Sequence, residues 1–328
     1  MNLNKIFTSN MVLPCDRIIR IFGDGDGEAT ASFCGKNAAA SASDGRWELT
    51  FPPMDCGGPY EMDLDLNGEK IRLENIYVGR VYIFAGQSNM QFKLDESNTD
   101  SKSCKPSQLV RLYSTDRLEA GESFFSGDGW LSADKTPIDK WPAIPYMVSE
   151  YISEKENVAV GAISCYQGAS VIESWLPDGT LEKVGIDIPD ELKHIDHREK
   201  RYIWNKNGAL YENTFSKIAP YSVNGVVWYQ GESDTSVEEG RVYDRELTEL
   251  IRIWREDLRD GELPFVVVQL ADLDGRGEGW SLVQEAQMRV SKALFGVKTV
   301  VSRDVCERDN IHPPTKDILS RRIAEALL

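Results

Sequence analysis

The chain has 328 residues, of which 41% are hydrophobic and 27% charged, as in an ordinary globular protein with room for one large domain and a small one. Its 53 acidic residues outnumber 37 basic ones, and a net charge of −16 would repel a phosphate backbone, which argues against nucleic acid as a partner. No apolar run approaches the roughly 20 residues that span a bilayer, and no secretory leader is visible, so we expect no membrane contact and a cytoplasmic location.

The cysteines and two of the histidines show no convincing metal-site pattern. No Cys-x-x-Cys pair or zinc-ribbon spacing occurs. His194 and His197 have H-x-x-H spacing, but no Glu-x-x-His or cysteine pattern accompanies them in the charged segment DELKHIDHREKRY. We therefore expect free, buried thiols and neither a metal nor a cofactor. The cysteines are Cys15, Cys34, Cys56, Cys104, Cys165 and Cys306.

Residues 1–75 predict a small antiparallel β-domain. Short alternating segments such as RWELTF, with Trp47, Leu49 and Phe51 on one face, are separated by turn residues. Asp44-Gly45 and Asn67-Gly68 are hairpin dipeptides, because the favoured two-residue turns require positive φ.

Residues 76–328 predict a parallel α/β domain. Strand-length segments that are apolar throughout alternate with helical patterns, and strands buried on both faces belong in a sheet covered by helices on both sides. The predicted strands are GRVYIFAG, VAVGAIS, VNGVVWYQ, PFVVVQLA and VKTVVS. The predicted helices cover about 141–154, 207–218, 237–258, 281–294 and 315–327.

Polar segments follow several of these strands, at the sheet edge where open α/β sheets bind ligands. One of them, RDNIHPP, holds His312 between the last strand and the last helix, which makes it the best candidate for a base. Asp309 precedes it by three residues in the same loop, so its carboxylate can orient the imidazole. Asp304 competes for this role at a less diagnostic spacing of eight residues.

Ser88 is the candidate nucleophile. It follows a predicted strand in FAGQSNMQ, two residues after Gly86, at the tight turn that an exposed catalytic hydroxyl needs. Met90 replaces the glycine of an α/β-hydrolase elbow, and no G-x-S-x-G occurs in the chain, which disfavours that fold. Gly168 in CYQGAS and Gln230 in WYQGESD also follow strands and could supply oxyanion donors.

Four segments together, GQSNM, QGASVIESW, WYQGESD and DNIHP, resemble the four blocks of the SGNH hydrolase superfamily, in the branch of sialate O-acetylesterases and related acetylxylan esterases. Segments of the N-terminal region are similar to the small β-domain that leads into the catalytic domain of that branch. The resemblance implies a three-layer α/β/α, flavodoxin-like domain.

The same resemblance implies a role for each matching residue. Ser88 would be the nucleophile, His312 the base and Asp309 its orienting acid, and the backbone N–H groups of Ser88 and Gly168 with the Gln230 side chain would form the oxyanion hole. Glu232 and Trp175 also lie in the motifs, where bracing a loop is as good an interpretation as contacting substrate.

We therefore expect a metal-independent serine esterase that removes acetyl groups from O-acetylated mono- or oligosaccharides through an acetyl-enzyme. Loops around 92–130 and 170–205 would line the sugar side, where Trp130, Trp175 or Trp204 could stack on a sugar. Two alternatives remain open: an esterase for acetylated xylan or mannan fragments, and a carbohydrate-binding protein with an inactive hydrolase fold.

Overall fold

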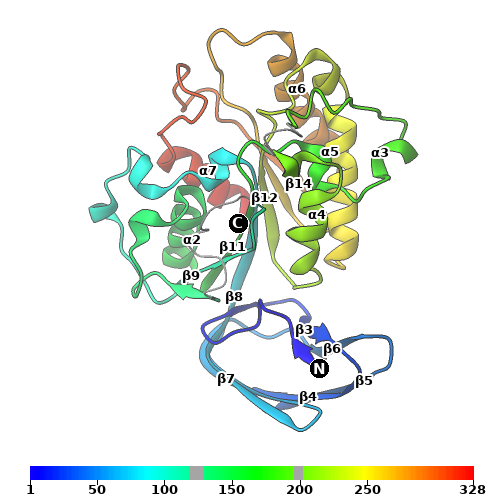
Figure 1. Cartoon of the computed structure of the whole chain (residues 1–328). Coiled ribbons are helices and arrows are strands. Elements are labelled where there is room, and N and C mark those ends of the chain that lie inside the picture. Colours follow the sequence, from blue (N-terminus) through cyan, green and yellow to red (C-terminus); the bar gives the residue numbers. More distant parts are fainter. Residues whose placement is uncertain (119–128, 196–201) are drawn as a thin grey trace.

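The computed structural model describes residues 1–118, 129–195 and 202–328. It shows a mixed α/β fold in which a large mixed sheet forms the centre of the molecule and a β-rich N-terminal region lies at one end of it (Figure 1). This confirms the α/β class. Within the described ranges, no helix is both long and apolar enough to cross a bilayer.

The N-terminal region contains short antiparallel strands. β1, β3 and β6 form a three-stranded sheet. β4 pairs antiparallel with β5 and β7, and β7 pairs antiparallel with β8. In β6, Trp47, Leu49 and Phe51 are buried and alternate with more exposed residues, as predicted. The strands are β1 (Asn2–Leu3), β2 (Val12–Pro14), β3 (Ile19–Asp24), β4 (Gly27–Phe33), β5 (Lys36–Ala42), β6 (Arg46–Phe51) and β7 (Gly57–Leu66).

The two predicted hairpin turns differ in backbone conformation. Asn67 and Gly68, between β7 and β8, both have positive φ (54° and 89°), as the favoured two-residue turn requires. At Asp44-Gly45, only Gly45 has positive φ. The cysteines form no disulfide; Cys34 is exposed, unlike the buried thiol that the sequence led us to expect.

Strand β8 (Glu69–Gly86) connects the N-terminal region to the large sheet without a break. Its first half pairs with β7, and its second half pairs in parallel with β11 and β12. The predicted boundary between residues 75 and 76 falls inside this strand. Gly86, the last residue of β8, therefore has a fixed place in the sheet, and the functional turn begins there.

The main sheet has the order β10-β9-β11-β8-β12-β13-β14. All its neighbouring strands are parallel except for the β10–β9 pair. Every residue of β12 and β13 is buried, which explains their uninterrupted apolar sequences. The strands are β9 (Val110–Ser114), β10 (Leu131–Ser132), β11 (Val160–Tyr166), β12 (Gly225–Tyr229), β13 (Phe265–Val268) and β14 (Val297–Val300).

Helices lie on both sides of this sheet: α2 and α7 on one side, α4, α5 and α6 on the other (Figure 1). Four of the predicted helices match these elements within a few residues, but the predicted helix 207–218 is broken at Thr214 into a short α-helix and a 3₁₀ turn. The helices are α1 (Ser88–Gln91), α2 (Ala143–Glu156), α3 (Thr180–Lys183), α4 (Ala209–Asn213), α5 (Val237–Asp257), α6 (Glu278–Ala293) and α7 (Asp317–Leu327), with 3₁₀ turns η1 (Leu94–Glu96), η2 (Ser101–Ser103), η3 (Ile138–Lys140), η4 (Ile172–Trp175), η5 (Ile203–Asn205) and η6 (Phe215–Lys217).

Candidate active site

The turn from β8 into α1 depends on Gly86. Its φ is 131°, and a Cβ built on it would lie 2.0 Å from the carbonyl oxygen of Tyr229. Any larger residue would therefore clash with β12 as well as being strained. This close approach of two strand ends lets Ser88 begin α1 at the carboxyl edge of the sheet.

Ser88 and His312 meet at this edge although they are 224 positions apart in the chain. His312 Nε2 lies 2.8 Å from Ser88 Oγ. Burial lowers the pKa of His312, and so does the positive charge of Lys316, while Glu96 opposes them. A neutral imidazole is thereby favoured near pH 7, and this is the form that can accept the hydroxyl proton.

Neither predicted orienting acid hydrogen-bonds to His312 in the described structure. Asp309 is exposed, and in the described structure no hydrogen bond joins it to His312; the backbone N–H of His312 donates instead to Asn310 Oδ1 at 2.9 Å. Both carboxylate oxygens of Asp304 accept from Arg322, at 2.7 and 2.8 Å. The carboxylate that raises the pKa of His312 electrostatically is Glu96, at the end of η1.

The backbone N–H of Gly168 is available for an incoming oxyanion. It donates to no acceptor in the part of the chain that the structure describes, and Gly168 lines the same pocket as Ser88 and His312. Ser88 is the first residue of α1, where a backbone N–H has no partner within the helix. These two groups have the free donors that an oxyanion hole requires.

The Gln230 side chain is not at the pocket surface. It is fully buried, and its Nε2 donates to the Ser170 carbonyl at 2.9 Å and to Asp234 Oδ2. Its Oε1 accepts from Tyr243 Oη at 2.8 Å. One amide hydrogen therefore holds the loop that carries Gly168, the other is bonded to Asp234 in the loop after β12, and neither is free for a substrate.

Asn89, which the sequence did not single out, connects the serine turn to the histidine loop. Its Nδ2 donates to the Ile311 carbonyl at 2.9 Å, one residue before His312, and to Glu232 Oε1 at 2.5 Å. Its Oδ1 accepts from Lys316 Nζ at 2.7 Å. Since Asn89 adjoins Ser88 and Ile311 adjoins His312, one side chain links the two segments that carry this pair.

Lys316 is a buried charge behind this pair. Its side chain is fully buried, with Nζ 4.9 Å from the centre of the Phe92 ring, and burial lowers its pKa to about 8. Burial raises the pKa of Glu232, while Asn89 and Lys316 oppose that shift. Lysine and glutamate thus share one polar network through Asn89.

The pocket around Ser88 is open and has a volume of about 920 Å³, enough for a sugar with its acyl group. Apart from Ser88, Gly168 and His312, its lining includes Gln87, Phe92, Glu96, Tyr202, Trp204 and Glu232. The sequence left both loop bracing and substrate contact open for Glu232, and its place in the lining is compatible with substrate contact. Acidic, amide and aromatic side chains are the groups that commonly contact sugar hydroxyls and ring faces.

The other candidates of the sequence analysis lie away from this pocket. Trp175 is fully buried, packs against Trp228 and Trp254, and donates through Nε1 to Ser170 Oγ at 3.0 Å. Trp130 is also buried and donates to the Ile6 carbonyl. Of the three tryptophans considered, Trp204 lines the pocket. His194 is exposed and does not line it, and His197 lies outside the described residues.

Comparison with known proteins gives a family match. The model of a family described as carbohydrate esterase, sialic acid-specific acetylesterase, matches residues 78–328. Human sialate O-acetylesterase is 23% identical over 323 residues, which cover 88% of this chain and 61% of the human protein. A probable carbohydrate esterase of Arabidopsis thaliana is 30% identical over 121 residues, covering 34% of this chain and 44% of that protein.

A solved structure, that of a carbohydrate acetylesterase from Xanthomonas citri, shares the fold. It superimposes with a TM-score of 0.84 at 24% identity, covering 99% of this chain and 74% of that protein. The likeness therefore extends through the N-terminal β-rich region. The chain spans about 61% of the length of the human relative.

Proposed function

Because the chain belongs to the carbohydrate esterase family of sialic acid-specific acetylesterases, we propose that it is a carbohydrate O-acetylesterase that acts through an acetyl-serine intermediate. The observation that carries the proposal is the 2.8 Å approach of His312 Nε2 to Ser88 Oγ in an open pocket beside the free N–H of Gly168. A nucleophile, a base and an oxyanion donor are the minimum for this chemistry.

In the proposed reaction, Ser88 Oγ attacks the acetyl carbonyl while His312 takes its proton. The oxyanion receives hydrogen bonds from the backbone N–H groups of Ser88 and Gly168. His312 then protonates the departing sugar oxygen, and the acetyl group stays on Ser88. A water molecule, deprotonated by His312, attacks the acetyl-enzyme; as acetate is released, His312 returns this proton to Ser88 Oγ and both residues regain their starting forms. Gln230 contributes by holding the Gly168 loop through the Ser170 carbonyl.

On the sugar side, Trp204 and Tyr202 offer ring faces, and Glu96 and Glu232 offer carboxylates for hydroxyl groups. The family match favours an O-acetylated sialic acid, for which Lys93 in the lining is a candidate carboxylate partner. The two acidic residues favour the alternative, a neutral acetylated xylo- or manno-oligosaccharide, because a carboxylate repels an anionic sugar.

Acetate release from two substrate panels tests this function: O-acetylated sialic acids, and acetylated xylo- and manno-oligosaccharides. We expect release from the sialic acid panel by the wild type. Release from the second panel alone would assign the alternative substrate class. Sugar binding without acetate release from either panel would contradict the enzyme assignment and favour the carbohydrate-binding alternative.

For the orienting acid we propose Asp309, since its place three residues before His312 in the same loop lets a rotation of its side chain reach Nδ1. We expect Asp309→Asn to lower kcat/KM by about 100-fold or more and Glu96→Gln by less than about tenfold. Steady-state kinetics measure both, and Asp304→Asn, which only breaks the pair with Arg322, is the matched control. The reverse order of effects would assign the role to Glu96.

We also propose that residues 76–328 form a three-layer α/β/α arrangement of the flavodoxin-like SGNH type and that residues 1–75 form a small β-domain. The parallel strands from β9 to β14 and the helices on both sides of the sheet support it. A cytoplasmic location is proposed from the sequence alone.

A further inference from the structure

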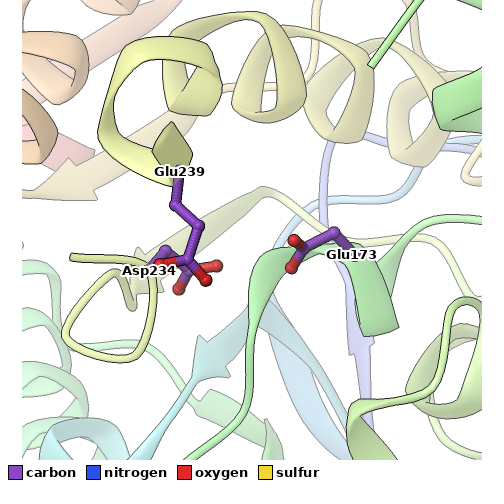
Figure 2. A group of neighbouring side chains, drawn as sticks. All are labelled: Glu173, Asp234 and Glu239. Carbon is purple, nitrogen blue, oxygen red and sulfur yellow. The ribbon is translucent and has the colours of Figure 1, made fainter. Parts of the chain in front are cut away.

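Three buried carboxylates converge on the far side of the Gly168 loop. Glu173 comes from η4, Asp234 from the loop after β12 and Glu239 from the first turn of α5 (Figure 2). One carboxylate oxygen from each lies within 4.8 Å of the other two. Their exposed fractions are 1%, 0% and 2%, so water does not screen their mutual repulsion.

A fourth buried carboxylate, Glu246, comes from two turns further along α5 and is close enough for the three charges to act on it. It is 1% exposed, and neither of its oxygens has a hydrogen-bond partner in the part of the chain that the structure describes. Burial raises its pKa, and the next causes are the negative charges of Glu173, Asp234 and Glu239. An unpartnered buried carboxylate is costly, so this one indicates a missing positive partner.

The oxygens of the cluster have free capacity for a ligand. Within the described residues, both oxygens of Glu173 and Oε1 of Glu239 accept no hydrogen bond. Each oxygen of Asp234 accepts one, from the Ile172 N–H and from Gln230. Burial raises the pKa of Glu173 to about 7. The cation that opposes this shift is Lys193, whose Nζ already donates to Asp190 and Asn207. Among the described residues, His194 also opposes the corresponding shift of the Glu239 pKa, and these two cations are fewer than the four carboxylates.

We propose that Glu173, Asp234 and Glu239 bind one divalent cation of the calcium type, with the carboxylate of Glu246 completing the charge around it. Any three points within 4.8 Å of one another fit in a circle of radius about 2.8 Å, so small side-chain adjustments give the 2.3–2.6 Å distances of Ca²⁺ to oxygen. Unpartnered carboxylate oxygens are the hard ligands that this ion prefers.

The site is structural and independent of the proposed esterase reaction. It joins η4, which follows the Gly168 loop by a few residues, to the loop after β12 and to the start of α5. Asp234 Oδ1 already accepts from the Ile172 N–H at 2.9 Å, so the ion reinforces an existing link. Its loss is expected to loosen the loop on one side of the pocket.

Metal analysis and thermal unfolding of the full chain test the site. Protein purified without chelator should contain about one equivalent of calcium by inductively coupled plasma mass spectrometry. Removing it with EDTA should lower Tm by roughly 5 °C, and adding back 1 mM Ca²⁺ should restore it. Mg²⁺ and Mn²⁺, tested separately, should restore less if the ligands fit the larger ion.

Two isosteric variants test whether the effect of Ca²⁺ on Tm arises at this cluster. In Glu173→Gln and in Glu246→Gln the Ca²⁺-dependent rise in Tm should fall to less than about a third, whereas without metal each variant should melt at or above the wild-type temperature because repulsion is relieved. Glu238→Gln, an exposed neighbour on α5, is the matched control and should keep the full response.

The pH dependence of the Tm response distinguishes a bound cation from protons that the carboxylates share. Ca²⁺ requires deprotonated carboxylates, so the metal-dependent rise in Tm should grow as the pH increases from about 5 to about 8. Three results would each overturn the proposal: no retained metal together with no Tm response to Ca²⁺, Mg²⁺ or Mn²⁺; an unchanged response in both glutamine variants; or a response that declines as the pH rises.

Discussion

Replacing Ser88 with alanine is expected to lower kcat for acetate release by at least about 10⁴-fold, because no other group can then form the acetyl-enzyme. His312→Ala should cost a similar factor, since the two residues act as one unit. The double variant should be little worse than either single one. Initial rates on the preferred substrate panel, with Tm as the check on folding, measure all three.

The chain offers matched controls for both substitutions. Ser233 is a second serine in the pocket lining, and His194 is an exposed histidine outside it. Ser233→Ala and His194→Ala should each retain activity within about tenfold of the wild type. Equal activity of Ser88→Ala and the wild type would show that Ser88 is only a turn residue and that the proposed nucleophile is wrong.

Ser88 and His312, which the structure brings together, could be selected as the candidate nucleophile and base because each choice depends on local sequence. A glycine two residues before a serine at the end of an apolar strand predicts a tight turn, and only three histidines compete for the role of base. Four motifs sufficed to place the chain in its family, which the match over residues 78–328 confirms. Strand ends and motifs can be recognised from residues that are neighbours in the chain, so the family and these two candidate residues follow from the sequence.

Side-chain direction at a strand end was not predictable. Gln230 follows β12, as expected, but Tyr243 on α5 and the Ser170 carbonyl hold its amide away from the pocket. Trp175 lies in a recognised motif, yet packing against Trp254 places it in the core. These directions depend on helices whose packing the local sequence does not specify.

Strand β9 was missed for a related reason. It lies within the range 92–130 that the sequence analysis assigned to loops. The guanidinium of its second residue, Arg111, is buried and donates to the carbonyls of Asn10 and Asn75 at 2.7 and 2.6 Å. The Tyr77 ring lies 4.5 Å below it. A buried arginine is recognisable only when its acceptors, from segments far away in the chain, are known.

Asn89 and Lys316 could not be paired from sequence either, since 227 positions separate them. Their contact leads to the second large prediction. We expect Lys316→Met to lower kcat by about 100-fold, because Asn89 loses the donor that orients its amide toward Ile311 and Glu232. Lys292→Met, at an exposed lysine of α6, is the matched control and should leave kcat unchanged.

A purely structural role for Lys316 predicts no change in the pH profile, whereas a positioning role beside His312 does. The charge of Lys316 lowers the pKa of His312, so its removal should raise that pKa. The acidic limb of kcat/KM should therefore move to higher pH in Lys316→Met. A limb that stays in place or moves to lower pH would contradict the electrostatic part of the role.

The stability of the same variant has its own pH signature. The pKa of Lys316 falls from 10.5 to about 8 on burial, so between these values the unfolded chain binds more protons than the folded one. The free energy of unfolding of the wild type therefore increases as the pH rises from about 8 to 10.5, and the methionine variant lacks this increase. Relative to the wild type, Lys316→Met should be most stable below pH 8 and should lose that advantage by pH 10.5. Denaturant unfolding across this range measures the difference, and a constant difference would mean that Lys316 is not a buried, desolvated charge behind the catalytic pair.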